Sequence, residues 1–283
     1  MKISSPRLRL LLAMTVFGTI GWFRRNIPLG SGELALYRAL MALLLIGTYL
    51  FVTRKLPSFA KIKKQLPLLM LSGIAIGINW ILLFEAYRYT TVSIATLSYY
   101  FAPVLVMLIC PVLFREKLTG KQILCFVLST VGLVMITGIG TGAGQHGKGI
   151  LYGLSAAVFY ASVILMNKKI DGVDGMERTF IQFMAAILVL LPYVLLTDGI
   201  HLSGLEVAAW GNLLVIGFVH TGIAYCLYFS ALKVLPGQKT ALLSYVDPLV
   251  AVLVSVVLLH EPMSILQVLG GILILGATLW NEL

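Results

Sequence analysis

Four ionisable side chains lie well inside long apolar stretches of the sequence: Arg38, Glu85, His220 and Asp247. An ionised group inside a bilayer costs several kcal/mol unless it is paired or faces water, so such residues mark candidate sites. Asp247 and His220 can change charge or pair with a cation, which is the chemistry of proton coupling or ammonium binding. Alternatively, Asp247 precedes Pro248 and can satisfy backbone groups that the proline leaves unpaired.

A second group of charges is predicted near one end of the spans. Glu85 and Arg88 are three residues apart, so an ion pair is expected on one helix face. Arg38, Arg24 and Arg25 lie toward the same side. We favour the interpretation that these arginines snorkel to the membrane interface. The alternative is a closing network of ion pairs, in which Arg38, Glu85 and Arg88 would be gate residues.

Polar and aromatic side chains at membrane depth predict a cavity. Tyrosine and tryptophan usually gather at membrane interfaces, whereas these lie deeper and need partners for their polar atoms. Ordinary helix packing explains each of them singly, but as a set they favour a cavity for an amphipathic ligand or a cation. With His220 and Asp247, the predicted substrate-binding residues are Asn79, Trp80, Tyr99, Tyr100, Tyr160, Tyr225 and Tyr245. Pro103 and Pro248 are predicted to interrupt helices within the span and to serve as bending points.

The elements that must position these residues are transmembrane helices. Of 283 residues, 59% are hydrophobic and 11% charged, with a mean hydropathy of +0.99, whereas soluble domains are about 25% charged. The net charge of +10 does not indicate nucleic-acid binding, because the basic residues lie in short loops between apolar runs. We predict an all-α integral membrane protein with ten spans, near 8–24, 33–53, 65–87, 91–114, 119–138, 149–167, 179–197, 207–230, 238–259 and 263–281.

Basic residues near span ends favour the cytoplasmic side. With the N-terminus inside, 16 of the 21 Lys and Arg residues fall on the cytoplasmic side and four on the other, while Arg38 lies within a span. The pattern therefore predicts a multi-pass protein of the plasma membrane with both termini in the cytoplasm.

An internal repeat relates the two halves of the chain. A shift of 145 residues aligns 77–128 with 222–273 without a gap, pairing Tyr100 with Tyr245, Pro103 with Pro248, Glu116 with Glu261 and Gln122 with Gln267. A unit of five spans is odd, so its second copy must be inverted in the membrane. The predicted units are 1–140 and 147–283, joined by a glycine-rich connector. Inverted repeats are typical of secondary transporters, although a duplicated scaffold without transport is also possible.

These features resemble the drug/metabolite transporter superfamily, of the EamA type. The resemblance rests on Tyr100-Phe-Ala-Pro103, its counterpart Tyr245-Val-Asp-Pro248, the duplicated Glu116 and Glu261, and the order of ten spans. It implies a central cavity lined by spans one to four and six to nine, with five and ten peripheral, and export of amino acids or other metabolites. Related small multidrug transporters carry a glutamate in the first span, but residues 8–23 contain no acidic residue.

The sequence thus predicts a secondary transporter of amino acids or related amphipathic metabolites that exports them by alternating access. An organic-cation or multidrug transporter is the first alternative. An intramembrane enzyme is less favoured, because the sequence lacks clustered acidic residues and a nucleophile motif. A channel or receptor is a further possibility. We expect a monomeric transport unit with a small-molecule substrate and lipid contacts, and with no cofactor, metal or nucleic acid.

Overall fold

The computed structural model describes residues 5–54, 62–114, 119–137, 146–197, 199–232, 234–235, 243–244 and 246–282. Every regular element in these ranges is a helix, so the predicted all-α class is confirmed. Tyr245 and Glu116 lie outside the described residues.

The helices before the glycine-rich connector are α1 (Pro6–Gly18), α2 (Ile20–Arg25), α3 (Ser31–Val52), α5 (Leu66–Tyr89), α6 (Val92–Tyr99), α7 (Ala102–Phe114) and α8 (Gly120–Thr137). Those after it are α9 (Gly147–Lys169), α10 (Gly175–Leu196), η2 (Leu202–Gly204), α11 (Val207–Leu214), η3 (Val215–Ile223), α12 (Ala224–Leu232), α14 (Val246–Leu253), η4 (Val254–Leu258) and α15 (Ile265–Glu282).

Five helical stretches are long and apolar enough to cross a membrane: α3, α5, α9, α10 and the continuous stretch Val207–Ala231. Shorter apolar helices cover Val92–Val106, Gly120–Ile136, Val246–Leu258 and Ile265–Asn281. Large apolar side chains such as Leu44, Leu196 and Ile265 are exposed on the outside of the bundle. Such a surface suits lipid rather than water, so the chain is a multi-pass membrane protein.

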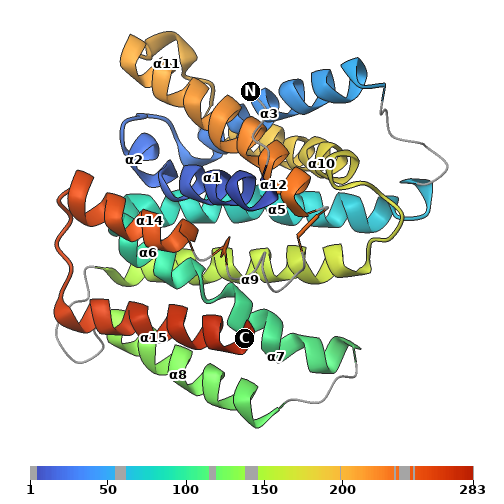
Figure 1. The fold of residues 1–283 in the computed structure, drawn as a ribbon. Coiled ribbons are helices and arrows are strands. Elements are labelled where there is room, and N and C mark those ends of the chain that lie inside the picture. The colour runs from blue at the N-terminus through green and yellow to red at the C-terminus, as the bar shows by residue number, and fades with distance from the viewer. Residues whose placement is uncertain are drawn as a thin grey trace.

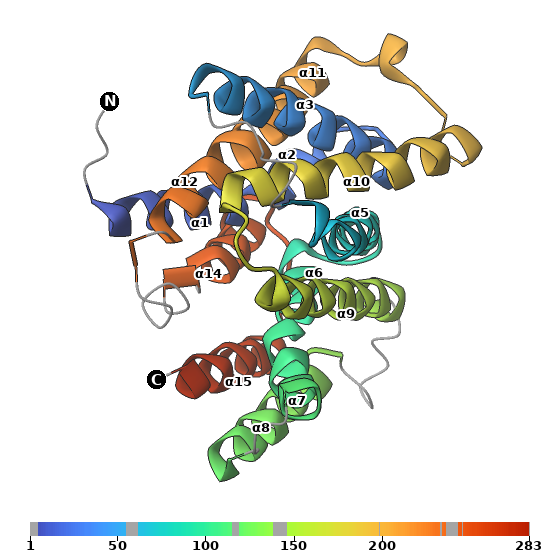
Figure 2. The same ribbon diagram turned by 90° about the vertical axis from the view of Figure 1, so that its right-hand side faces the viewer.

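Helix α5 packs between α9 and α10 near the middle of the bundle, whereas α8 and α15 pack against each other at one edge (Figures 1 and 2). Glycines allow the closest approaches. A Cβ on Gly132 of α8 would lie 2.6 Å from the carbonyl oxygen of Gly270 on α15, and a Cβ on Gly270 would lie 2.5 Å from that of Gly132. Gly73 of α5 is in similar backbone contact with Gln182 of α10.

The membrane-depth segment that contains Pro103 is a broken helix. Helix α6 ends at Tyr99, and α7 begins at Ala102, so that Pro103 is its second residue. Pro248 is the third residue of α14. A helix has no internal acceptor for its first N–H groups, so proline in the first turn removes no bond. Pro103 therefore lies directly after a break in its span, whereas Leu243 and Ser244 ahead of α14 are also helical and residue 245 lies outside the described residues. The bending role of both prolines stays a prediction.

Candidate functional site

A cavity of about 460 Å³ lies between the helices and receives side chains from both halves of the chain. Among the described residues, α3, α8 and α15 contribute none of its lining. The lining comprises Met14, Phe17, Ile76, Asn79, Trp80, Tyr99, Tyr100, Pro103, Tyr160, Val163, Ile164, Asn167, Arg178, Thr179, Gln182, Phe183, Tyr225, Tyr228, Phe229, Ser244 and Asp247.

Asp247 provides the cavity's carboxylate. The Oη of Tyr100, at the break between α6 and α7, donates a hydrogen bond of 2.6 Å to Asp247 Oδ2. The position of α14 is fixed from the opposite side by α1, because a Cβ on Gly18 would lie 2.5 Å from the Asp247 carbonyl oxygen. No further hydrogen bond to this carboxylate is found within the described part of the chain, so it can receive one from a ligand.

Aromatic rings form much of the remaining wall. The ring of Tyr99 stacks on Tyr160, with centroids 5.1 Å apart. Tyr225 lies edge-on to Phe17 and Phe183, at 5.3 and 5.4 Å. Ring faces carry partial negative charge, so such a wall favours cations and aromatic or aliphatic groups.

One end of the cavity reaches the junction of α9 and α10, here called the Arg178 end. The Arg178 guanidinium donates to the carbonyl oxygens of Asn167 at 3.2 Å and Ile170 at 2.8 Å, near the C-terminus of α9. Gln182 Nε2 donates to Ser72 Oγ and Asn167 Oδ1. These polar groups satisfy the end of α9 and line the approach to the cavity.

Most residues of the predicted binding set lie together in this cavity, whereas Tyr245 cannot be placed. Asn79, Trp80, Tyr99, Tyr100, Tyr160, Tyr225 and Asp247 all line it, as does Pro103. Asn79 is tied into the wall because its Nδ2 donates to Ala156 O at 2.7 Å. Phe17, Gln182 and Arg178 also line the cavity, although the sequence did not predict them. A lone phenylalanine, and polar groups near a predicted helix end, give no signal of facing a cavity.

His220 does not line the cavity. It is buried in η3, with Nε2 2.9 Å from Thr19 Oγ1 and Nδ1 3.2 Å from the Val215 carbonyl oxygen. The ring of Phe23 packs edge-on against it at 4.9 Å. Its contacts join η3 to the first helices, which corrects its predicted place in the binding set.

Arg38 is buried rather than interfacial, so the snorkelling interpretation is wrong for it. Only 4% of the residue is exposed. Its Nε donates to Thr221 Oγ1 at 3.0 Å, and its guanidinium lies 4.3 Å from the Trp80 ring centroid and 5.2 Å from that of Phe84. Stacking on rings supplies the charge with partners that lipid could not.

The predicted Glu85 and Arg88 ion pair is present, with Arg88 Nη1 2.8 Å from Glu85 Oε1. Its arginine is half exposed, and the pair joins two residues of the same helix. Arg88 also borders a shallow hollow with Arg24 and Arg25. A pair within one helix does not hold separate segments together.

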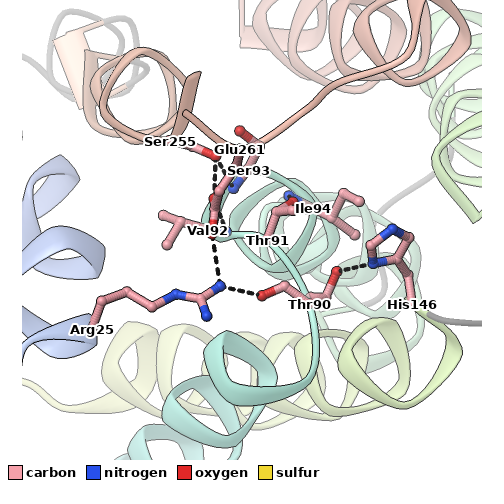
Figure 3. A network of polar contacts seen from close by, with 9 residues as sticks. All are labelled: Arg25, Thr90, Thr91, Val92, Ser93, Ile94, His146, Ser255 and Glu261. Atoms are coloured by element: carbon pink, nitrogen blue, oxygen red, sulfur yellow. Dashed lines mark hydrogen bonds and ion pairs between the residues drawn. The ribbon is translucent and has the colours of Figure 1, made fainter. Parts of the chain in front are cut away.

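A different ion pair does join separate segments (Figure 3). Arg25 Nη2 lies 2.7 Å from Glu261 Oε1 and also donates to the Thr90 carbonyl oxygen at 2.7 Å. These contacts lie at the N-terminal end of α9, since Thr90 Oγ1 is 2.9 Å from His146 Nδ1. This Arg25 end is therefore opposite the Arg178 end.

The same network supplies acceptors to the start of α6. Val92 N donates to Glu261 Oε2 at 2.7 Å, Ser93 N to Ser255 Oγ at 3.2 Å, and Ser255 Oγ donates to Glu261 Oε2. We call Arg25, Thr90, Val92, Ser93, Ser255 and Glu261 the α6 lock. Within the described residues, no group of three or more His, Cys, Asp or Glu side chains is placed to hold a metal ion.

Comparison with known proteins identifies the family. The chain matches the EamA-like transporter family over residues 7–138 and again over 147–282. It is 29% identical over 277 residues to the uncharacterized transporter YxxF of Bacillus subtilis strain 168, covering 96% of this chain and 87% of that protein. It is 27% identical over 274 residues to protein PecM of Dickeya dadantii strain 3937, covering 93% of this chain and 86% of PecM.

A solved crystal structure shares the fold. It superimposes with a TM-score of 0.68 at 17% sequence identity, and the match covers 98% of this chain and 97% of the chain in that structure. The two family matches together account for nearly all of the sequence. The chain therefore belongs to the EamA-like transporter family.

Proposed function

We propose that this protein is a secondary transporter for small amphipathic metabolites that carry an ammonium group, such as amino acids and amines. The observation that carries the proposal is the cavity in which Asp247 faces a wall of aromatic rings. A carboxylate in a low-dielectric cavity requires a compensating positive charge, either a proton or a bound cation. The rings stabilise the same cation and the apolar part of its carrier.

Alternating access is the proposed mechanism. In it, ten spans form two inverted units, 1–140 and 147–283, around the cavity. The Arg25 end is closed by the α6 lock, whereas the cavity lining extends to the Arg178 end. Because basic residues favour the cytoplasmic side, the Arg178 end faces the cytoplasm in this topology. The conformation is thus inward-facing, in a plasma membrane protein with both termini inside that exports its substrate.

Within the proposed substrates, organic cations without a carboxylate form a second class beside the amino acids. Amino acids carry a carboxylate that needs a donor, and the cationic residue of the described lining is Arg178. Its guanidinium already donates to backbone carbonyls of α9. This engagement favours simple amines over zwitterions.

Counterflow in proteoliposomes tests the proposal. Vesicles loaded with one unlabelled compound should accumulate the labelled form, and matched pairs of an amino acid and its decarboxylated amine separate the two substrate classes. Asp247→Asn should raise the substrate concentration needed for half-saturation by about tenfold or more, since a hydrogen bond to a charged group contributes about 1.5–3 kcal/mol. Asp171→Asn removes an exposed carboxylate outside the cavity and is the matched control. Flux without counterflow would indicate a channel and contradict the carrier.

A further inference from the structure

Three segments that line the cavity continue beyond it and meet at the α6 lock. On each segment, a cavity residue and a lock residue are separated by seven or eight positions, about 11 Å of helix. The pairs are Phe17 and Arg25, Tyr99 and Val92, and Asp247 and Ser255. The lock therefore lies about two helical turns beyond the binding residues, on the same three segments.

We propose that the α6 lock is the gate that closes this end of the cavity and separates when the carrier turns to face the other side. The inference rests on the carrier function proposed above and names the contacts that hold its closed state. They join α2, the start of α6 and the chain after η4, which come from different halves of the sequence. The closing network that the sequence left open is thus formed by Arg25 and Glu261 instead of Arg38, Glu85 and Arg88.

Glu261 is the centre of the lock. Its carboxylate accepts from Arg25, from the Val92 backbone N–H and from the Ser255 hydroxyl, and its side chain is 12% exposed. The three donors come from three separate segments. Loss of this one carboxylate therefore releases all three contacts together.

The segments at the lock are closely packed. Val92 and Ser255 are fully buried, and Thr90 is 6% exposed. The side chain of Val92 occupies the space that a Cβ on Gly21 would need, so α2 and α6 touch directly at this level. Separation of α2 from α6 is consequently required before the cavity can open here.

Helix capping makes the closure reversible. The first N–H groups of an α-helix lack internal acceptors, and in a dry environment each must find one elsewhere. Thr91 Oγ1 accepts from Ile94 N within the chain turn, but Val92 N and Ser93 N depend on Glu261 and Ser255. When the lock opens to water, water can take over these two N–H groups, so opening does not leave buried donors unpaired.

Thiol labelling tests the gate without any need for a known substrate. In a variant whose native cysteines Cys110, Cys125 and Cys226 are replaced by alanine, Phe17→Cys places a thiol in the cavity wall. A membrane-impermeant thiol reagent is added to either face of reconstituted vesicles. Asn26→Cys, in a separate sample, identifies the face that carries the lock.

Glu261→Gln should raise the labelling rate of Cys at position 17 from the lock face by about tenfold, the effect of losing a charge-assisted contact. Arg25→Gln is the second variant and should act in the same direction, which keeps the test decisive if one protein folds poorly. Arg88→Gln breaks the ion pair within α5 and is the matched control, with no expected change.

If the labelling rate from the lock face is unchanged in both folded lock variants, the proposal that the α6 lock is a gate is overturned. If counterflow persists in that case, the carrier function stands and only the lock is rejected. If labelling rises as expected but no amine or amino acid shows counterflow, the gate stands and the proposed substrate class is rejected.

Discussion

Tyr100 and Asp247 join the two halves of the molecule within the cavity, through a hydrogen bond of 2.6 Å from the phenol to the carboxylate. Tyr100 lies at the break between α6 and α7, and Asp247 in the first turn of α14. Breaks in membrane helices leave polar backbone at depth, where it is tolerated beside a cavity. The contact therefore joins the broken segment of α6 and α7 to the cavity carboxylate on α14.

Tyr100→Phe should show how much the positioning of the Asp247 carboxylate by Tyr100 contributes to substrate binding. The variant keeps the ring but removes the hydrogen-bond donor to Asp247. We therefore expect the dissociation constant for an amine to rise by about three- to tenfold, which is less than in Asp247→Asn. Equilibrium binding of a labelled amine to purified protein measures this. Tyr152→Phe, on an aromatic pair outside the cavity, is the control. Equal effects of Tyr100→Phe and Tyr152→Phe would contradict the positioning role.

Arg38→Gln should destabilise the fold. The substitution removes a buried guanidinium that stacks on Trp80 and bonds to Thr221, and we expect a loss of about 2–3 kcal/mol. Thermal unfolding in detergent measures the change. Arg88→Gln removes a half-exposed arginine and should change stability by less than about 1 kcal/mol. A similar melting temperature for both variants would show that Arg38 is not a structural centre.

Gly132→Leu should force α8 and α15 apart. There is no room for a side chain, because the Gly270 carbonyl oxygen lies 2.6 Å from where a Cβ would stand. Overpacking of this kind costs about 1–3 kcal/mol, which lowers the melting temperature. Gly276→Leu on α15 meets nothing within 4 Å and is the control. Because neither helix lines the cavity, substrate affinity of the folded Gly132→Leu protein should stay unchanged.

Pro103→Ala and Pro248→Ala should preserve folding and slow transport. Proline has no backbone N–H, so alanine removes no hydrogen bond at either position and melting temperatures should change little. Alanine, however, restores the backbone N–H and relieves the clash of the proline ring with the preceding turn, so each segment becomes a stiffer helix. Initial counterflow rates at saturating substrate measure the effect. Rates equal to those of the native protein in both variants would remove the hinge role.

The sequence alone determined the membrane class and the all-helical fold, because hydropathy depends on composition along the chain and needs no knowledge of contacts. It also identified several of the cavity residues, since a tyrosine or an aspartate at membrane depth is conspicuous among leucines. The ion pair of Glu85 and Arg88 was predictable for the same kind of reason, because it is local to one helix.

Tertiary structure decided which side of each helix faces the cavity. A helix surrounded by lipid is apolar on both its packed and its exposed sides, so the amphipathic signal that orients helices in soluble proteins is weak. Phe17 was therefore missed, and His220 was placed in the cavity when it packs against Thr19 and Phe23.

The α6 lock depended on tertiary structure most of all. Arg25 and Glu261 are 236 positions apart in the chain, and the backbone N–H of Val92, which completes the contact, has no signature in any sequence. Arg38 illustrates the same limit, since hydropathy places a charge in a span but cannot tell whether rings or the membrane interface will receive it. Contacts between distant segments form only when the chain has folded, and so the structure alone could assign them.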